Sequence, residues 1–265
     1  MSESTALLLT GRDVLPLLHR MTSNALAELM PGSARVTLFC DFRGRLQHRA
    51  LVAVTGDGAV WLLRSDAPGA ELAAAVDRMV FRDDVRIEDR SGEFVVVLAS
   101  SPGNEARILD EASGVPRVVA CGDGTLLALD ARAPLPEPER IARLLPRHGH
   151  EIAEAFNPFE VGLAHEVHLA KGCFTGQEAL QRLVTYDSVR RRPAHVRLAA
   201  GDVRLPAELR AGGDRVGVLT SVDGHDGFAV VRHEPIMNRS RLSLADGSEV
   251  EVVHAPELSR PLGRA

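Results

Sequence analysis

The sequence predicts an α+β fold in which antiparallel sheet and helices are followed by a small β-barrel. Two observations support this prediction. In the first part of the chain, strand-like and helix-like segments alternate, and many connections are too short for the crossovers of a parallel sheet. After about residue 188 the helical patterns stop, and short strand-like segments separated by Asp-Gly turns follow. We therefore expect an α+β domain over residues 1–188 and a barrel domain over residues 189–265.

Each element is predicted from its local pattern. A helix opens at Asp13, where Pro16 is tolerated because it falls in the first turn. Further helices are expected at 69–79, 104–112 and 137–145. Strands are expected at 34–40, 46–54, 59–63, 85–88, 94–98, 118–120 and 126–129. The barrel strands are expected at 189–198, 215–221, 228–231, 241–244 and 249–253, and the tail 256–265 is expected to be loose.

The composition is that of a soluble globular protein. The chain has 265 residues, 45% of them hydrophobic and 25% charged, which excludes collagen-like, coiled-coil and mostly disordered chains. Its formal net charge of -5 gives no overall attraction for nucleic acid, so we expect no direct nucleic-acid binding. No apolar stretch approaches the ~20 residues needed to span a bilayer, and we expect no membrane contact.

The cysteines and the start of the sequence indicate the compartment. Cys40, Cys121 and Cys173 form an odd, sparse set, which does not make a disulfide framework and suits a reducing environment. The first residues have no basic region before their short apolar run, unlike a signal peptide. The sequence therefore predicts a cytoplasmic protein.

Lysine is almost absent from this chain. Of the 31 basic residues, 30 are Arg and Lys171 is the only Lys. The two side chains are nearly interchangeable on a solvated face, but they differ where a compact ammonium or a shifted pKa matters. Lys171 is therefore either a chance survivor or a residue that the chemistry requires.

The segment around Lys171 favours the second interpretation. Thr175 and Glu178 have the spacing of a capping box, so we expect a helix to start there. Cys173 then lies just ahead of a helix N-terminus and beside Lys171, and both would favour its thiolate. Such a thiolate is a nucleophile, a redox group or a soft-metal ligand, whereas the alternative is that Cys173 serves packing alone.

Other motifs carry weaker signals. His148 and His150, like His165 and His168, could ligate a metal, but they lack the helical spacing of a zincin and a CxxC partner, so no metal site is expected. The run 190–192 of three arginines could meet an anion, but such a run is more often a solvated or inter-domain face. No Walker A loop, GxGxxG motif or G-x-S-x-G elbow is present.

Residues 171–178 form the octet Lys171, Gly172, Cys173, Phe174, Thr175, Gly176, Gln177 and Glu178. It is a complete copy of the signature K-G-C-[FY]-x-G-Q-E, and by it the sequence resembles the YgfZ family, the folate-binding relatives of the glycine-cleavage T-protein. The glycines of this motif let the backbone turn tightly. The stretch 157–163 resembles the P-x-E-x-G-L stretch that precedes the signature. The stretch 213–221 is similar to a strand of the T-protein's terminal barrel, and 11–13 and 40–45 fit the family's N-terminal pattern.

The resemblance implies a cloverleaf of T-protein-like subdomains that holds tetrahydrofolate. It also implies a role in assembling or repairing iron–sulfur clusters, with iron–sulfur client proteins such as radical tRNA thiolation enzymes as partners. Cys173 and Lys171 take the place of the functional motif residues. Folate contacts are implied at Asp41, Arg45 and Arg182.

Two departures from the related patterns bear on activity. T-proteins carry an Asp pair after the hairpin glycine, and one carboxylate is needed for aminomethyl transfer, whereas His48 and Arg49 stand at these positions here. Ala142 stands where related chains carry a Glu that holds the pterin. We therefore expect an accessory protein more than an enzyme. The alternatives are a tetrahydrofolate-dependent one-carbon (aminomethyl) transferase and a non-catalytic folate- or protein-binding module.

Overall fold

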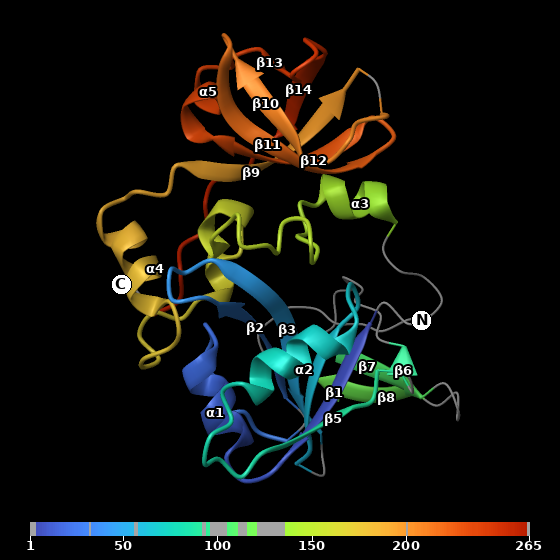
Figure 1. Ribbon diagram of the computed structural model, residues 1–265, viewed down its shortest axis with the longest axis vertical. Helices are drawn as coiled ribbons and strands as arrows, with labels where there is room; N and C mark the ends of the chain where they lie inside the picture. Colours follow the sequence, from blue (N-terminus) through green and yellow to red (C-terminus); the bar gives the residue numbers. More distant parts are fainter. Residues whose placement is uncertain are drawn as a thin grey trace.

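The structure is a computed structural model that describes residues 4–31, 33–55, 58–91, 94–95, 105–110, 116–120, 136–199 and 201–263. The described parts form a sheet with two helices, a middle layer of short helices and loops, and a β-barrel above it (Figure 1). The expected α+β class with antiparallel sheets and a small barrel is confirmed.

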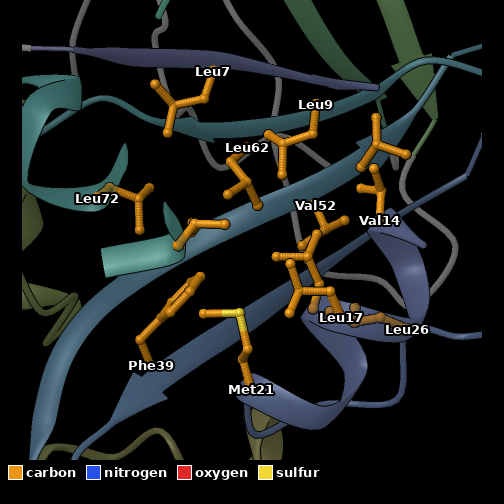
Figure 2. Packing of buried hydrophobic residues seen from close by; sticks show 14 of the residues in the cluster. Leu7, Leu9, Val14, Leu17, Met21, Leu26, Phe39, Val52, Leu62 and Leu72 are labelled. Atoms are coloured by element: carbon orange, nitrogen blue, oxygen red, sulfur yellow. The ribbon is translucent and has the colours of Figure 1, made fainter. Parts of the chain in front are cut away.

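The first sheet has five antiparallel strands in the order β2-β3-β4-β1-β5. They are β1 (Thr5–Thr10), β2 (Ala34–Cys40), β3 (Leu46–Val54), β4 (Val60–Arg64) and β5 (Arg86–Asp89). The helices α1 (Val14–Met21) and α2 (Gly69–Asp77) cover this sheet. Leucine and valine side chains from the sheet meet those of α1, α2 and the loop after α1, which carries Leu26, in one apolar core (Figure 2).

The middle layer carries the predicted signature motif. It contains α3 (Glu137–Ala142), the 3-10 turns η1 (Pro158–Val161) and η2 (Ala164–Glu166), and α4 (Gln177–Thr185). A second apolar core joins this layer to the ends of β2 and β3 below and to the barrel strand β12 above. Because Phe228 and Val230 of β12 belong to this core, the barrel is packed directly on the layer.

The barrel is closed, with the strand order β10-β11-β12-β9-β14-β13. Its strands are β9 (Arg191–Leu198), β10 (Ala207–Ala211), β11 (Asp214–Asp223), β12 (Asp226–Arg232), β13 (Leu242–Ser243) and β14 (Glu249–His254), and α5 (His233–Met237) follows β12. Closure leaves no free sheet edge, and the inward side chains form a third core.

Two local predictions are wrong. The segment expected as a helix at 104–112 forms β7 (Glu105–Asp110), in a sheet with β6 (Phe94–Val95) and β8 (Pro116–Ala120). Its residues are good helix formers, but strand pairing outweighs this weak preference. The helix α5 interrupts a region where no helix was expected. The expected strand 126–129 lies outside the described residues.

The tail expected to be loose is attached at one point. The backbone N–H of Leu262 donates to Val167 O at 2.7 Å, and the N–H of Leu169 donates to Leu262 O at 3.1 Å. Leu262 thus forms a parallel bridge with His168. Composition alone gave no signal for this pairing, since the contact is made by backbone groups.

Candidate functional site

The loop between η2 and α4 carries Lys171 and Cys173 and is joined to helix α1. The ammonium of Lys171 donates a hydrogen bond to the backbone carbonyl of His19. In return, the imidazole Nε2 of His19 lies 2.9 Å from the carbonyl oxygen of Lys171. Lys171 is the only lysine in the sequence. Its side chain is half-buried in this contact rather than freely solvated.

The ring orientation of His19 is fixed by its other nitrogen. Nδ1 accepts hydrogen bonds from the backbone N–H groups of Leu26 at 3.0 Å and Ala27 at 3.1 Å. An acceptor nitrogen carries no proton, so the hydrogen of the neutral ring lies on Nε2 and is donated to Lys171 O. His19 therefore links the end of α1, the following loop and the Lys171 loop.

Burial changes the acidity of Lys171. It lowers the pKa of the ammonium from 10.5 to about 8. The same ammonium lies 5.0 Å from the centre of the Phe174 ring, whose face attracts a cation. Phe174 is buried in the middle-layer core, and this contact helps fix the side of the loop on which the ammonium lies.

The thiol of Cys173 is exposed, in contrast to that of Cys40. Burial raises the pKa of the Cys40 thiol to about 12, so Cys40 is an inert core residue. Cys121 lies outside the described residues. Within the described parts of the chain, no hydrogen bond or ion pair joins the Lys171 ammonium to Cys173 Sγ, because the ammonium is directed to His19. The role of Lys171 in the structure is thus to hold the loop.

The predicted capping box is wrong. Helix α4 starts at Gln177, with Gly176 as its N-cap at φ 83 and no side-chain cap. A side chain at Gly176 would be forced to within 2.4 Å of Asp41 O, so close backbone packing sets the start of the helix. Glu178 pairs instead with Arg182 at 2.5 Å on the helix surface, and Thr175 lies one residue ahead of the cap.

The remaining motif residues support the loop as well. Gly172 has φ 111, a left-handed conformation that favours glycine, which confirms the predicted tight turn. The side-chain amide of Gln177 donates to the carbonyl of Leu169 at 2.8 Å. Together with the Leu262 contact to Val167 and Leu169, this bond holds the segment that precedes Lys171.

The turn at the expected folate contacts packs beside the start of α4. The Asp41 carboxylate accepts hydrogen bonds from the N–H groups of Arg43 and Arg45, both at 2.8 Å. The guanidinium of Arg45 lies 3.5 Å from the Glu160 carboxylate. The Asp41 carboxylate therefore stabilises the turn, and the Arg45 guanidinium lies beside the Glu160 carboxylate. Arg182 is exposed and paired with Glu178 on the surface of α4.

Arg49 occupies a buried ion pair that sequence reasoning missed. Its Nε and Nη2 contact both oxygens of Glu166, with Nη2 2.5 Å from Oε1 and Nε 2.9 Å from Oε2. Burial alone would raise the pKa of Glu166, but the charge of Arg49 together with the hydrogen bonds from His165 and Arg49 outweighs it and holds this pKa at about 2. At the position where the resemblance places a T-protein carboxylate, this chain thus carries a cation, Arg49, that is paired with Glu166.

His48 belongs to a cluster with His148 and Arg64. The two imidazole rings are stacked at 5.4 Å, and Arg64 Nη1 lies 3.2 Å from His48 Nδ1 and 3.3 Å from His148 Nδ1. Burial and the Arg64 charge lower the pKa of His48 to about 3. Pairing of His148 with the distant His48 was not visible in the sequence.

Geometry alone makes this cluster a possible metal site. Ligand atoms of His48, His148 and Glu71 all lie within 4.8 Å of one another. The buried Arg64 opposes a metal in two ways. Its positive charge repels a cation, and its N–H groups favour unprotonated Nδ1 atoms, which places the ring protons on the Nε2 atoms. We assign no metal to this cluster.

The residues at the expected pterin contact do not fit a pterin. Ala142 ends α3 and is exposed, and its methyl group offers no hydrogen bond. The nearby carboxylates are already used. Glu137 accepts from Arg140 Nη2 at 2.7 Å, and the fully buried Glu151 accepts from Arg140 Nη1 at 3.2 Å and from Ser221 at 2.8 Å. These carboxylates are therefore not free to pair with a pterin.

Comparison with solved structures identifies the class of fold. The glycine cleavage system aminomethyltransferase T from Bartonella henselae matches with a TM-score of 0.71, over 100% of this chain and 86% of that chain, at 13% sequence identity. The chain thus has the aminomethyltransferase fold. Within the described residues, every helix is too short or too polar to cross a membrane.

Sequence comparison adds three relatives. A protein named "Putative transferase At1g60990, chloroplastic" from Arabidopsis thaliana is 30% identical over 46% of this chain, a match that spans only 29% of its own length. Aminomethyltransferases of Symbiobacterium thermophilum and Geobacillus kaustophilus are 24% and 26% identical, each over 80% of this chain and 70% of their own. No protein-family model matches the chain.

Proposed function

We propose that this chain is a YgfZ-like accessory protein that assists the assembly or repair of iron–sulfur clusters in client proteins through the thiol of Cys173. The observation that carries the proposal is the exposure of Cys173 on a loop held by a half-buried ammonium. An accessible sulfur can exchange with a partner disulfide, or bind iron after losing its proton. A loop kept in one conformation presents that sulfur in a defined position.

A second observation supports an accessory role over group transfer. Arg49 is paired with Glu166 at the position where the resemblance places a T-protein carboxylate. A guanidinium cannot replace a carboxylate that accepts a proton. The fold would allow tetrahydrofolate as a ligand, but the exposed Ala142 removes one expected pterin contact. We therefore propose that the chain binds tetrahydrofolate with low affinity.

Complementation tests the proposal. A bacterial strain that lacks its own homologue should regain iron–sulfur enzyme activity with the wild-type chain and lose this rescue with Cys173→Ala. Cys40→Ala is the matched control, since it removes a thiol that is buried in the core. Rescue by Cys173→Ala at the wild-type level, with equal protein amounts on an immunoblot, would show that the thiol is dispensable.

The alternative function is a tetrahydrofolate-dependent aminomethyl transfer, which the similarity to the two aminomethyltransferases favours. It predicts that the purified chain forms methylene-tetrahydrofolate from an aminomethyl donor. Our proposal predicts no such product above background. Titration with tetrahydrofolate in the same preparation separates a chain that binds folate without transfer from one that does neither.

A further inference from the structure

A basic cavity of about 600 Å³ opens on the barrel. It lies where the start of β9 meets β11, β12 and α5, and none of its lining residues belongs to the Lys171–Glu178 motif. Its volume falls in the roughly 300–1,000 Å³ range of small-molecule sites. The titratable residues that line it are Arg190, Arg191, Arg215, Arg232, His233 and Glu234. Arginine therefore dominates the wall of the cavity.

Two of these arginines face each other across neighbouring strands. Arg191 of β9 and Arg232 of β12 are directly paired in the antiparallel register. Side chains at such positions emerge on the same face of the sheet, and like charges placed opposite each other are destabilising. Both residues line the cavity. Glu160 offsets the charge of Arg191 through two hydrogen bonds, so Arg232 is the member of this pair whose charge is left for an anion.

Among the arginines of the cavity, Arg191 is paired with an acid. Its Nε and Nη2 donate to Glu160 at 2.7 Å and 2.9 Å, although the same carboxylate also faces Arg45 at 3.5 Å. The contact of Arg215 with Glu208 is 3.4 Å long and exposed on both sides, so it is weak.

Two exposed arginines of the cavity keep their charge available. Arg190 and Arg232 are exposed, and within the described residues neither takes part in an ion pair. Glu234 is the single acid among the lining residues. The cavity consequently holds a net positive charge.

His233 fixes one wall of the cavity. Its Nδ1 accepts a hydrogen bond from Arg192 Nε at 2.7 Å, its Nε2 lies 3.0 Å from Val189 O, and its backbone N–H donates to Arg190 O at 3.0 Å. Burial lowers the pKa of this imidazole, so the ring is neutral in these bonds. The start of β9 and α5 are thereby tied together, and the backbone that carries Arg190 and Arg232 is held in place.

From the cavity and its charges we infer a binding site for a small anion that carries two or more phosphate or carboxylate groups. Guanidinium groups bind both oxyanions through paired hydrogen bonds, and several exposed arginines around one concave space favour a multivalent ligand over chloride or acetate. The concave shape and the small number of lining residues fit a small molecule better than a continuous nucleic-acid backbone.

Binding of two probes to the purified full chain tests the inference. Pyrophosphate represents phosphate ligands and tri-glutamate represents carboxylate ligands, each titrated calorimetrically at low and at physiological salt. At least one probe should bind, with an affinity that falls as salt rises. Arg232→Gln should weaken it about tenfold, and the pair Arg190→Gln with Arg232→Gln about a hundredfold, because each removes a charged hydrogen bond to the ligand.

Arg197→Gln is the matched control. It removes the same charge from β9, but Arg197 lies opposite Asp226 and Glu251 instead of another arginine, and it should change binding less than about twofold. Thermal unfolding of every variant shows that it folds. The preferred probe assigns the ligand to phosphates or carboxylates. Failure of both probes at millimolar concentration, an equal loss with Arg197→Gln, or variant-sensitive binding of only a single-stranded oligonucleotide would overturn the inference.

Discussion

Lys171 and His19 are joined by two hydrogen bonds that run in opposite directions. The ammonium of Lys171 donates to the carbonyl of His19, and the imidazole of His19 donates to the carbonyl of Lys171. Each residue therefore supplies one side-chain group and one backbone group to the contact. The pair joins α1 to the loop of Cys173, so the loss of either partner should loosen that loop.

Replacing His19 should loosen the loop. In His19→Leu the carbonyl of Lys171 and the N–H groups of Leu26 and Ala27 lose their partner. Partly buried groups left unpaired cost about 1–3 kcal/mol in all. Chemical denaturation should show this loss, and hydrogen exchange should become faster at residues 168–173. His254→Leu is the control, since His254 is exposed on β14 and the change should alter stability by less than about 0.5 kcal/mol. Equal effects of the two changes would contradict the linking role of His19.

Lys171 should react as an amine at unusually low pH. Its pKa of about 8, against 10.5 for the unperturbed group, leaves much of it neutral near pH 8. As the only lysine, it gives a single labelled side-chain peptide in mass spectrometry. The labelling rate by an amine-selective ester should rise with a midpoint near pH 8 in the folded chain and near 10.5 in urea. A folded midpoint near 10.5 would show that the ammonium is solvated.

The same shift has a consequence for stability. Between about pH 8 and 10.5 the unfolded chain binds more protons at Lys171 than the folded chain does. The contribution of this group to stability is therefore least favourable below pH 8, and it rises as the pH rises through this window. Lys171→Met should remove that rise from the pH dependence of the denaturation midpoint. An unchanged pH dependence in the variant would argue against the burial of the ammonium.

Arginine should not replace Lys171. The ammonium fits between the carbonyl of His19 and the face of Phe174, whereas a guanidinium is larger and planar. Lys171→Arg should therefore reduce rescue in the complementation assay while it preserves the charge. Arg182→Lys, which exchanges the same residue types at an exposed position, should rescue fully. Full rescue by Lys171→Arg would mean that charge alone is sufficient.

The two described cysteines should differ sharply in reactivity. Cys173 is exposed, and the thiol of Cys40 is buried with its pKa raised to about 12. Iodoacetamide at pH 8 should modify Cys173 in the native chain and Cys40 only after denaturation, as measured on separate peptides. Protection of Cys173 equal to that of Cys40 would remove the basis of the proposed function.

The Arg49–Glu166 pair should contribute to folding. Arg49→Met leaves the buried Glu166 carboxylate without its cation and should cost about 3–5 kcal/mol. The control Arg182→Met breaks an exposed pair and should cost less than about 1 kcal/mol. Because the pKa of Glu166 is lowered to about 2, its stabilisation is present above pH 4.5 and is lost as the pH falls toward 2. Similar losses for the two variants would contradict this account.

Strand positions were largely predictable, because alternation and turn residues are local signals. The predicted limits of β2 and β3 coincide with the observed ones. The segment at β7 was not predictable in this way, since residues 105–110 favour a helix and become a strand only by pairing with β8. The attachment of Leu262 was also invisible, because backbone hydrogen bonds between distant segments leave no pattern in side-chain types.

The sequence marks the residues of the candidate site, but it does not reveal their contacts. The isolation of Lys171 in the composition and the spacing of the motif marked the loop. The partner of Lys171 was expected to be Cys173, its neighbour in sequence, but it is His19 from α1. Likewise Glu166 pairs with Arg49 across the fold. Local spacing reports which residues share a turn, whereas long-range partners depend on the packing of whole elements.

The hydrogen bonds between residue 262 and the segment 167–169 can form only late in the synthesis of the chain. Every strand of the barrel is translated before residue 262 leaves the ribosome, so the support it gives to the thiol-bearing loop is the last to form. A nascent chain stalled within the barrel would display its sulfur without that support.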